Sequence, residues 1–209
     1  MEISVVSICA ASGDDIAVCV LVSNGAESQR EKFVISVDAY AKMGISKGEI
    51  DTDTYEALEW EAGVSSAFKR AMAILGFGSC SKRALVSKLL KKGFEREYAV
   101  AAVERADELG FIDDEQNAHR EAERCAAKLW GEARIRASLI QKGYSSDVVE
   151  QALCQLEDDG VDFEENCREL IRRKYPVLPK ERAELQKLIA ALMRYGYTLS
   201  QIKSALSKK

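Results

Sequence analysis

Histidine, proline and long apolar runs are scarce in this 209-residue chain, and their scarcity argues against histidine-based sites and membrane spans. His119 is the only histidine, so we expect neither a histidine-based metal site nor histidine-dependent catalysis. The two prolines mark the entry to the last two predicted helices, and Pro179 suits a first helical turn. No run of 18 apolar residues exists, so we expect no membrane span. The N-terminus has no basic segment ahead of its short apolar run, and we therefore expect a cytoplasmic protein.

Motifs for catalysis and for metal binding are also missing. None of the six cysteines forms a Cys-x-x-Cys pair, so we expect buried or surface thiols instead of metal or redox chemistry. The chain has no phosphate-binding glycine loop and no Ser/His/Asp arrangement. Asp113 and Asp114 are adjacent carboxylates, but a capping role explains Asp113, and neighbouring helical residues point in different directions. We therefore expect no enzyme, no metal and no cofactor.

Charge is unevenly distributed along the chain, although the net charge is only −4. Residues 1–60 carry 4 Lys/Arg against 11 Asp/Glu, whereas residues 179–209 carry 7 against 2. The strongly basic signature of a dedicated DNA-binding protein is absent. The helical part nevertheless has basic regions that can meet an acidic partner.

Residues 1–60 read as a small antiparallel β segment followed by short helices. Two runs rich in β-branched residues, "ISVVSICA" and "DIAVCVLVS", are separated by the turn cluster "ASGDD". Asn24-Gly25 predicts a tight turn before a third strand, "KFVISV". The stretch from Val37 to Ala62 predicts a short helix, a glycine-rich turn and another helix.

Three helix ends share one pattern around Gly93, Gly143 and Gly196, which lie 50 and 53 residues apart. Each glycine fits the position just after a helix, where a left-handed backbone costs other residues about 1 kcal/mol or more. An aromatic follows each glycine. Apolar residues recur eight and four positions before it and six and ten positions after it: Leu85, Ile135 and Leu188; Leu89, Leu139 and Leu192; Ala99, Val149 and Ile202; Val103, Leu153 and Leu206. These positions form single helical stripes, and we expect them to be core.

The period leaves room for one further helix per repeat, so the predicted unit is three helices repeated three times. We expect a mostly α protein, an elongated array of three tandem three-helix repeats with a small N-terminal antiparallel β segment. The predicted boundaries are 1–60 for the β-rich extension and 61–111, 112–160 and 161–209 for the repeats. Thr198 with Gln201 predicts a capping box, and Ser145 a helix cap, whereas Glu95 is a poor cap.

Four segments follow one another in order along the chain: "SKRALVSKLLKKGF" (81–94), "LGFIDDEQNA" (109–118), "WGEARIRASLIQKGYSSDVVEQAL" (130–153) and "RKYPVLPKERAELQKLIAALMRYGY" (173–197). Together they resemble the RecX family of bacterial recombinase regulators, and the resemblance covers nearly the whole chain. It implies a non-enzymatic monomer that binds RecA filaments on single-stranded DNA and inhibits strand exchange and ATP hydrolysis. It also implies a role in recombination, DNA repair and the SOS response. The chain departs from the pattern at Asn117, where many members carry an aromatic.

Basic residues on the polar sides of the repeat helices are the candidate binding residues for RecA or single-stranded DNA. They are Lys82, Arg83, Lys88, Lys91, Lys92, Arg134, Arg136, Lys142, Arg172, Arg173 and Lys174. Lys88, Lys91 and Lys92 have the spacing of one helical face. The alternative is that all are ordinary solvated cations, some favoured near helix C-termini. Phe94, Tyr144 and Tyr197 can stack on bases, but packing is the stronger expectation. Glu157-Asp158-Asp159 reads as a solvated linker.

Two other functions stay open. The chain can be a helical-repeat adaptor for single-stranded nucleic acid or for a protein, unrelated to RecA. An enzyme has the least support.

Overall fold

The computed structural model describes residues 2–25, 27–179 and 181–207, and within them it is mostly helical with a four-stranded antiparallel sheet. The predicted fold class is therefore confirmed. Contacts divide the chain into two compact units, residues 1–78 with 85–111, and residues 79–84 with 112–209. No helix in the described part is long and apolar enough to cross a membrane.

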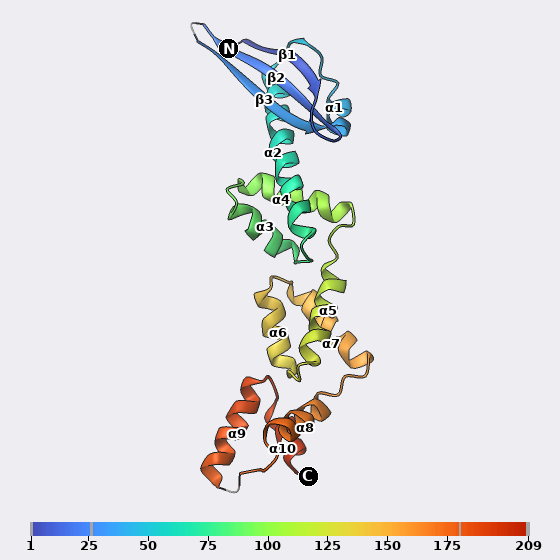
Figure 1. Ribbon diagram of the computed structural model, residues 1–209, viewed down its shortest axis with the longest axis vertical. Helices are drawn as coiled ribbons and strands as arrows, with labels where there is room; N and C mark the ends of the chain where they lie inside the picture. The colour runs from blue at the N-terminus through green and yellow to red at the C-terminus, as the bar shows by residue number, and fades with distance from the viewer. Residues whose placement is uncertain (1, 26, 180, 208–209) are drawn as a thin grey trace. The chain divides into compact units, whose positions relative to one another are not determined.

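The first unit begins with a sheet of order β3-β2-β1-β4, and Figure 1 shows its three long strands side by side. The strands are β1 (Glu2–Ala10), β2 (Asp15–Asn24), β3 (Glu27–Ser36) and the two-residue β4 (Gly48–Glu49). β4 was not predicted. The short helix α1 (Val37–Met43) follows β3 and begins at a Ser36 cap. Val18, Val20, Ile35 and Leu58 lie in the buried core between the sheet and the following helix.

Helix α2 (Thr52–Leu75) is one unbroken helix. The sequence predicted a helix that ends by Ala62 and a new repeat from residue 61, and α2 runs through that predicted boundary. Its Gly63 faces α4, because a Cβ there would lie 2.7 Å from the Tyr98 ring. α2 packs on α4 (Arg96–Glu108), with α3 (Lys82–Leu90) as the middle helix of the first set. The repeat boundaries themselves stay predictions.

The second unit holds two further sets of three helices. They are α5 (Asp114–Ala126), α6 (Glu132–Gln141) and α7 (Ser146–Asp158), then α8 (Phe163–Lys174), α9 (Arg182–Arg194) and α10 (Leu199–Ser207). In each set the first and third helices pack together. The predicted stripe is core: Leu85, Leu89, Ile135, Leu139, Leu188 and Leu192 are all at most 3% exposed.

The helix ends behave as the glycine pattern predicted. Gly93, Gly143 and Gly196 have φ of 89°, 93° and 96°. The amide of the following aromatic donates to the carbonyl five residues back in all three copies, which completes a Schellman motif. Thr198 and Gln201 form the predicted capping box, Ser145 caps α7, and Glu95 makes no side-chain cap. Cys125 and Cys167 are buried and Cys9 and Cys154 exposed, all as free thiols.

Candidate functional site

The second unit brings two aromatic rings and three cations together, and we call this group the aromatic–cation cluster. Its members are Lys128, Trp130, Arg134, Lys174 and Tyr195. The Arg134 guanidinium lies 4.0 Å from the Trp130 ring centroid and 5.0 Å from that of Tyr195. Lys174 Nζ lies 4.4 Å from the Tyr195 centroid and hydrogen-bonds its hydroxyl. Lys128 Nζ lies 5.7 Å from the Trp130 centroid.

Backbone hydrogen bonds between α6 and α9 position this cluster. The Gly131 amide at the start of α6 donates to the Tyr195 carbonyl at 2.7 Å, and the Ala133 amide donates to the Gly196 carbonyl at 3.2 Å. Free amides of one helix start thus meet free carbonyls of another helix end. The approach requires glycine, because a Cβ on Gly131 would lie 2.4 Å from the Gly196 carbonyl carbon. Trp130 and Tyr195, which adjoin these glycines, are therefore held beside each other.

The cluster carries uncompensated positive charge. In the described part of the chain, neither Lys128, Arg134 nor Lys174 pairs with a carboxylate. The hydrogen bond from Lys174, with the positive charges of Lys174 and Arg134, lowers the pKa of the Tyr195 hydroxyl. Cations held over aromatic faces suit a nucleic-acid base with its phosphate, or an acidic protein surface.

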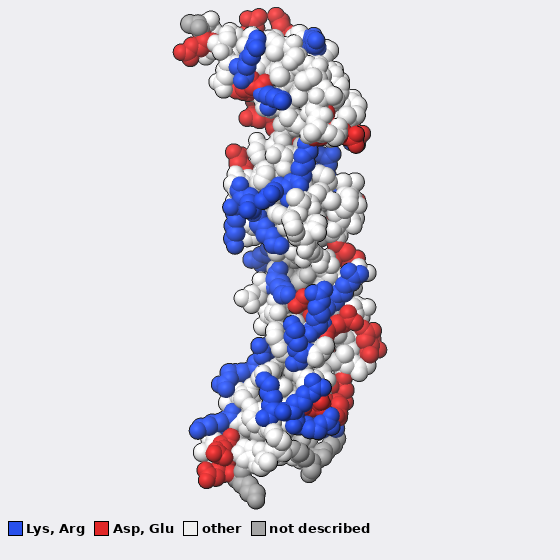
Figure 2. All heavy atoms as spheres, viewed as in Figure 1, with Lys and Arg blue, Asp and Glu red and all other residues white. Residues whose placement is uncertain are grey.

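The other predicted cations between residues 112 and 179 have acidic partners. Arg136 binds Glu132 at 2.7 Å and also contacts Glu150, and Lys142 binds Glu121 at 2.6 Å. Arg172 and Arg173, in the last turn of α8, both contact Glu169. Exposed pairs of this kind contribute about 0–1 kcal/mol, so they position the side chains more than they stabilise the fold. Figure 2 shows the Lys and Arg side chains of the second unit interleaved with Asp and Glu.

The predicted cations on and after α3 form a separate group. Lys88, Lys91 and Lys92 are exposed, and among the described residues none of them forms an ion pair with a carboxylate. Because α3 ends at Leu90, Lys91 and Lys92 lie in the turn after the helix. Arg83 is exposed near the start of α3, and the adjacent Lys82 amide donates to the Asp114 carboxylate at 3.2 Å. Whether these residues bind a partner stays a prediction.

The sequence-based candidates did not include Lys128, Trp130 and Tyr195. One pattern could have indicated them: Trp130 lies four residues before Arg134 at a predicted helix start, and basic residues flank both Trp130 and Tyr195. The expectation that the other aromatics pack in the core is confirmed, since Tyr144 and Tyr197 are 7% and 3% exposed and Phe94 is half-buried against a core cluster. Burial raises the pKa of Tyr144 to about 12.

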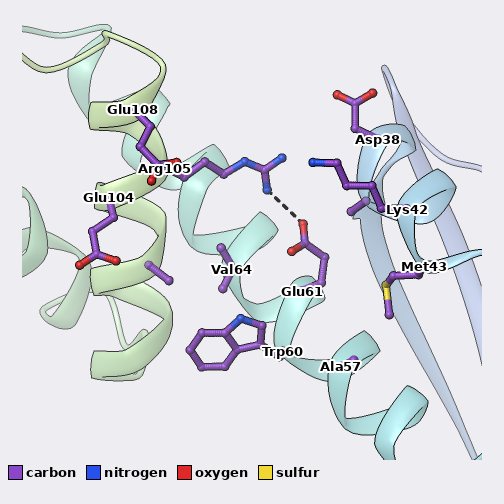
Figure 3. Close-up of a pocket in the computed structure, with 12 residues that line it drawn as sticks. Asp38, Lys42, Met43, Ala57, Trp60, Glu61, Val64, Glu104, Arg105 and Glu108 are labelled. Carbon is purple, nitrogen blue, oxygen red and sulfur yellow. Dashed lines mark hydrogen bonds and ion pairs between the residues drawn. The ribbon is translucent and has the colours of Figure 1, made fainter.

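A cavity of about 490 Å³ lies in the first unit between α1, α2 and α4 (Figure 3). Arg105 Nη1 donates to Glu61 at 3.0 Å, and Lys42 extends toward this pair from α1. Trp60, 44% exposed, provides an apolar wall. The remaining charged lining residues are acidic: Asp38, Glu104 and Glu108. The sequence did not predict this cavity.

The fold and the cluster define a class of protein: its described residues form three sets of three helices and a small N-terminal sheet, with cations held against two aromatic rings in the second unit. Residues 162–206 match the family model described as "RecX, third three-helix domain". The fold also resembles the crystal structure of a regulatory protein RecX. The match covers 97% of this chain and 99% of that chain, with a TM-score of 0.73 at 21% sequence identity. RecX from Lactobacillus salivarius gives TM-score 0.59 at 18% identity, covering 70% of this chain and 96% of that one.

Sequence relatives carry the same name. "Regulatory protein RecX" of Chlorobaculum tepidum is 32% identical over 148 residues, which cover 70% of this chain and 89% of the relative. The namesake of Xanthomonas axonopodis pv. citri is 33% identical over 138 residues, covering 66% and 83%. The chain belongs to the RecX family and is a RecX-family regulator.

Proposed function

We propose that this chain is a cytoplasmic, non-catalytic regulator that binds the RecA recombinase filament on single-stranded DNA and lowers its strand exchange and ATP hydrolysis. Membership of a family named for regulation supports the regulatory class. The observation that carries the proposal is the aromatic–cation cluster, whose three cations have no carboxylate partner in the described residues. Such a surface suits the phosphates and acidic side chains that a protein–DNA filament presents.

The tandem arrangement supplies the mode of action. Three helical sets follow one another along the chain, and each helix of about 12 residues is roughly 18 Å long. A monomer of this kind can contact more than one subunit of a filament and oppose movement between them. The cations on and after α3 and the aromatic–cation cluster belong to different helical sets and serve as separate contacts in this proposal.

ATP turnover by RecA on single-stranded DNA, with and without this protein, tests the proposal. Charge reversal of Lys88, Lys91 and Lys92 to Glu is expected to weaken inhibition about 10-fold or more without unfolding, since all three side chains are exposed. The matched control reverses three other exposed cations, Arg182, Lys187 and Lys203, and is expected to inhibit normally. Equal inhibition by both triple variants would remove the α3 cations from the contact surface.

The second candidate, an adaptor for single-stranded nucleic acid, draws support from Trp130 and Tyr195, whose half-buried rings can stack on bases. Direct DNA binding at two salt concentrations separates the two candidates. Steeply salt-dependent DNA binding with no change in RecA turnover would favour the adaptor.

A further inference from the structure

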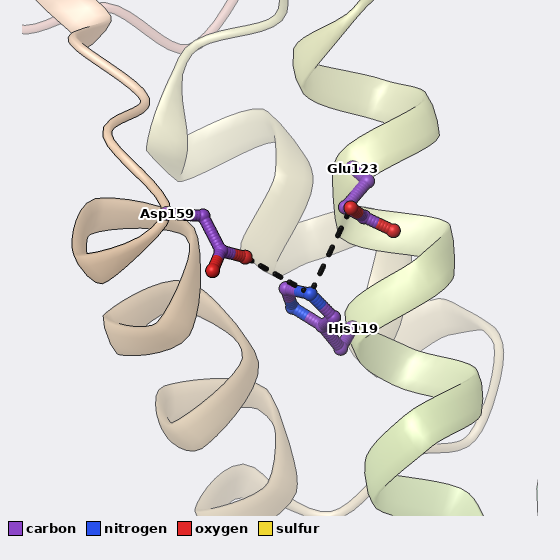
Figure 4. A group of neighbouring side chains, drawn as sticks. All are labelled: His119, Glu123 and Asp159. Carbon is purple, nitrogen blue, oxygen red and sulfur yellow. Dashed lines mark ion pairs between the residues drawn. The ribbon is translucent and has the colours of Figure 1, made fainter.

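His119, Glu123 and Asp159 converge in the second unit although they come from different elements (Figure 4). His119 and Glu123 lie one helical turn apart on α5, and Asp159 is the C-cap of α7. His119 Nε2 lies 3.1 Å from Asp159 Oδ2 and 3.8 Å from Glu123 Oε1. The candidate ligand atoms all lie within 4.8 Å of one another.

These separations suit a shared metal ion. Ligands that bind zinc tetrahedrally at about 2.0–2.2 Å lie roughly 3.3 Å from one another. The two distances from His119 Nε2 bracket that value, and Glu123 is an exposed, flexible side chain that can close the remaining gap. One imidazole nitrogen and two carboxylates are all ligand types that zinc accepts, and three protein ligands leave the fourth position open for water, as in catalytic-type zinc sites.

We propose that His119, Glu123 and Asp159 bind a divalent transition-metal ion, with zinc as the best fit. The imidazole selects zinc over magnesium and calcium, which prefer oxygen ligands. The sequence predicted no histidine-based metal site, and it placed Asp159 in a solvated linker, so this proposal reverses both expectations. Their convergence depends on the packing of α5 against α7.

The surroundings of the three ligands are acidic. Glu123 and Asp159 also line a hollow of about 490 Å³, together with Asp162 and Glu165. Asp162 caps α8, and Glu165 is paired with Arg168, so Glu123 and Asp159 carry the negative charge that a divalent ion would offset.

Zinc would connect α5 to the turn at Gly160 and Val161 that leads into α8. It would therefore restrain the segment where the second helical set passes into the third. Binding to the folded chain alone raises stability by mass action, about 2.7 kcal/mol at a hundredfold excess over Kd.

Calorimetric titration of the full chain with zinc chloride tests the site. The exposed and half-buried thiols can also bind zinc, so the experiment uses the Cys9→Ser, Cys19→Ser, Cys80→Ser and Cys154→Ser background. We expect one ion per chain, and about 10-fold or greater weakening in His119→Gln and in Asp159→Asn. Asp158→Asn, the same charge change one residue earlier, is the control and should bind normally. Circular dichroism checks that each variant is folded.

Cobalt provides the second readout. Bound Co²⁺ should show visible absorption without a thiolate charge-transfer band, and His119→Gln should lose that absorption. Zinc affinity unchanged in both ligand variants, or binding lost in the serine background, would overturn the proposal. Magnesium binding as tight as zinc binding would show a nonspecific acidic cluster and would also overturn it.

Discussion

The pKa of the Tyr195 hydroxyl reports on its contact with Lys174 in the aromatic–cation cluster. Lys174 donates a hydrogen bond to its hydroxyl, and this bond, with two nearby positive charges, lowers the pKa of Tyr195 below its usual value near 10. We expect Lys174→Met to raise that pKa back toward 10. The measurement is NMR titration of tyrosines labelled at Cζ.

Lys187→Met is the control for this titration, because Lys187 is exposed on α9 and is not among the groups that shift the pKa of Tyr195. A Tyr195 that titrates near 10 in the unaltered protein would mean that the Lys174 contact does not persist in solution.

Tyr144 shows the opposite shift, and its sign predicts alkaline lability. Burial, reinforced by the charges of Asp114 and Glu121, raises the pKa of Tyr144 to about 12, whereas an unfolded tyrosine titrates near 10. The unfolded chain loses the proton first, so the contribution is fully present below pH 10 and is lost as pH rises toward 12. Tyr144→Phe should match the parent at pH 8 and exceed its stability by up to about 2 kcal/mol near pH 12. Urea unfolding across this range measures the difference, and parallel losses in both proteins would contradict it.

At the scale of elements, two of the three glycines that follow helix ends should differ in how much an alanine substitution destabilises the protein. Gly93 and Gly196 share a left-handed backbone, but a Cβ at Gly93 meets open space, whereas at Gly196 it would lie 2.5 Å from the Arg134 amide nitrogen. We expect Gly93→Ala to cost about 1 kcal/mol of unfolding free energy and Gly196→Ala about 1–3 kcal/mol more. Urea denaturation of the two variants measures both costs. Equal costs would mean that α6 does not dock on the end of α9.

Local features were predictable because their causes are local. The apolar stripes, the left-handed glycines and the Thr198–Gln201 capping box each depend on residues within about one or two helical turns. The aromatic–cation cluster could not be predicted, since Trp130 and Tyr195 become neighbours only when α6 docks on α9. The convergence of His119, Glu123 and Asp159 could not be predicted either, because it depends on the packing of α5 against α7. The unbroken α2 was missed because Gly63 reads as a weak point until the Tyr98 ring packs on it.

At the scale of the whole molecule, we propose a regulator with contacts on more than one helical set. Motifs that recur in order along the chain predicted the family. Relatives 32% and 33% identical over 70% and 66% of the chain establish it. The proposed contact surface is not encoded in any one motif. Its assignment depends on which cations lack carboxylate neighbours after folding, and only the structure reveals those neighbours.

The most direct test of the central claim is a titration of RecA ATP turnover on single-stranded DNA with increasing amounts of this protein. A regulator that spans neighbouring subunits should inhibit turnover well below one copy per recombinase subunit. Inhibition that required one copy per subunit would contradict the spanning arrangement. Turnover that stayed unchanged at equimolar protein would contradict the proposed function itself.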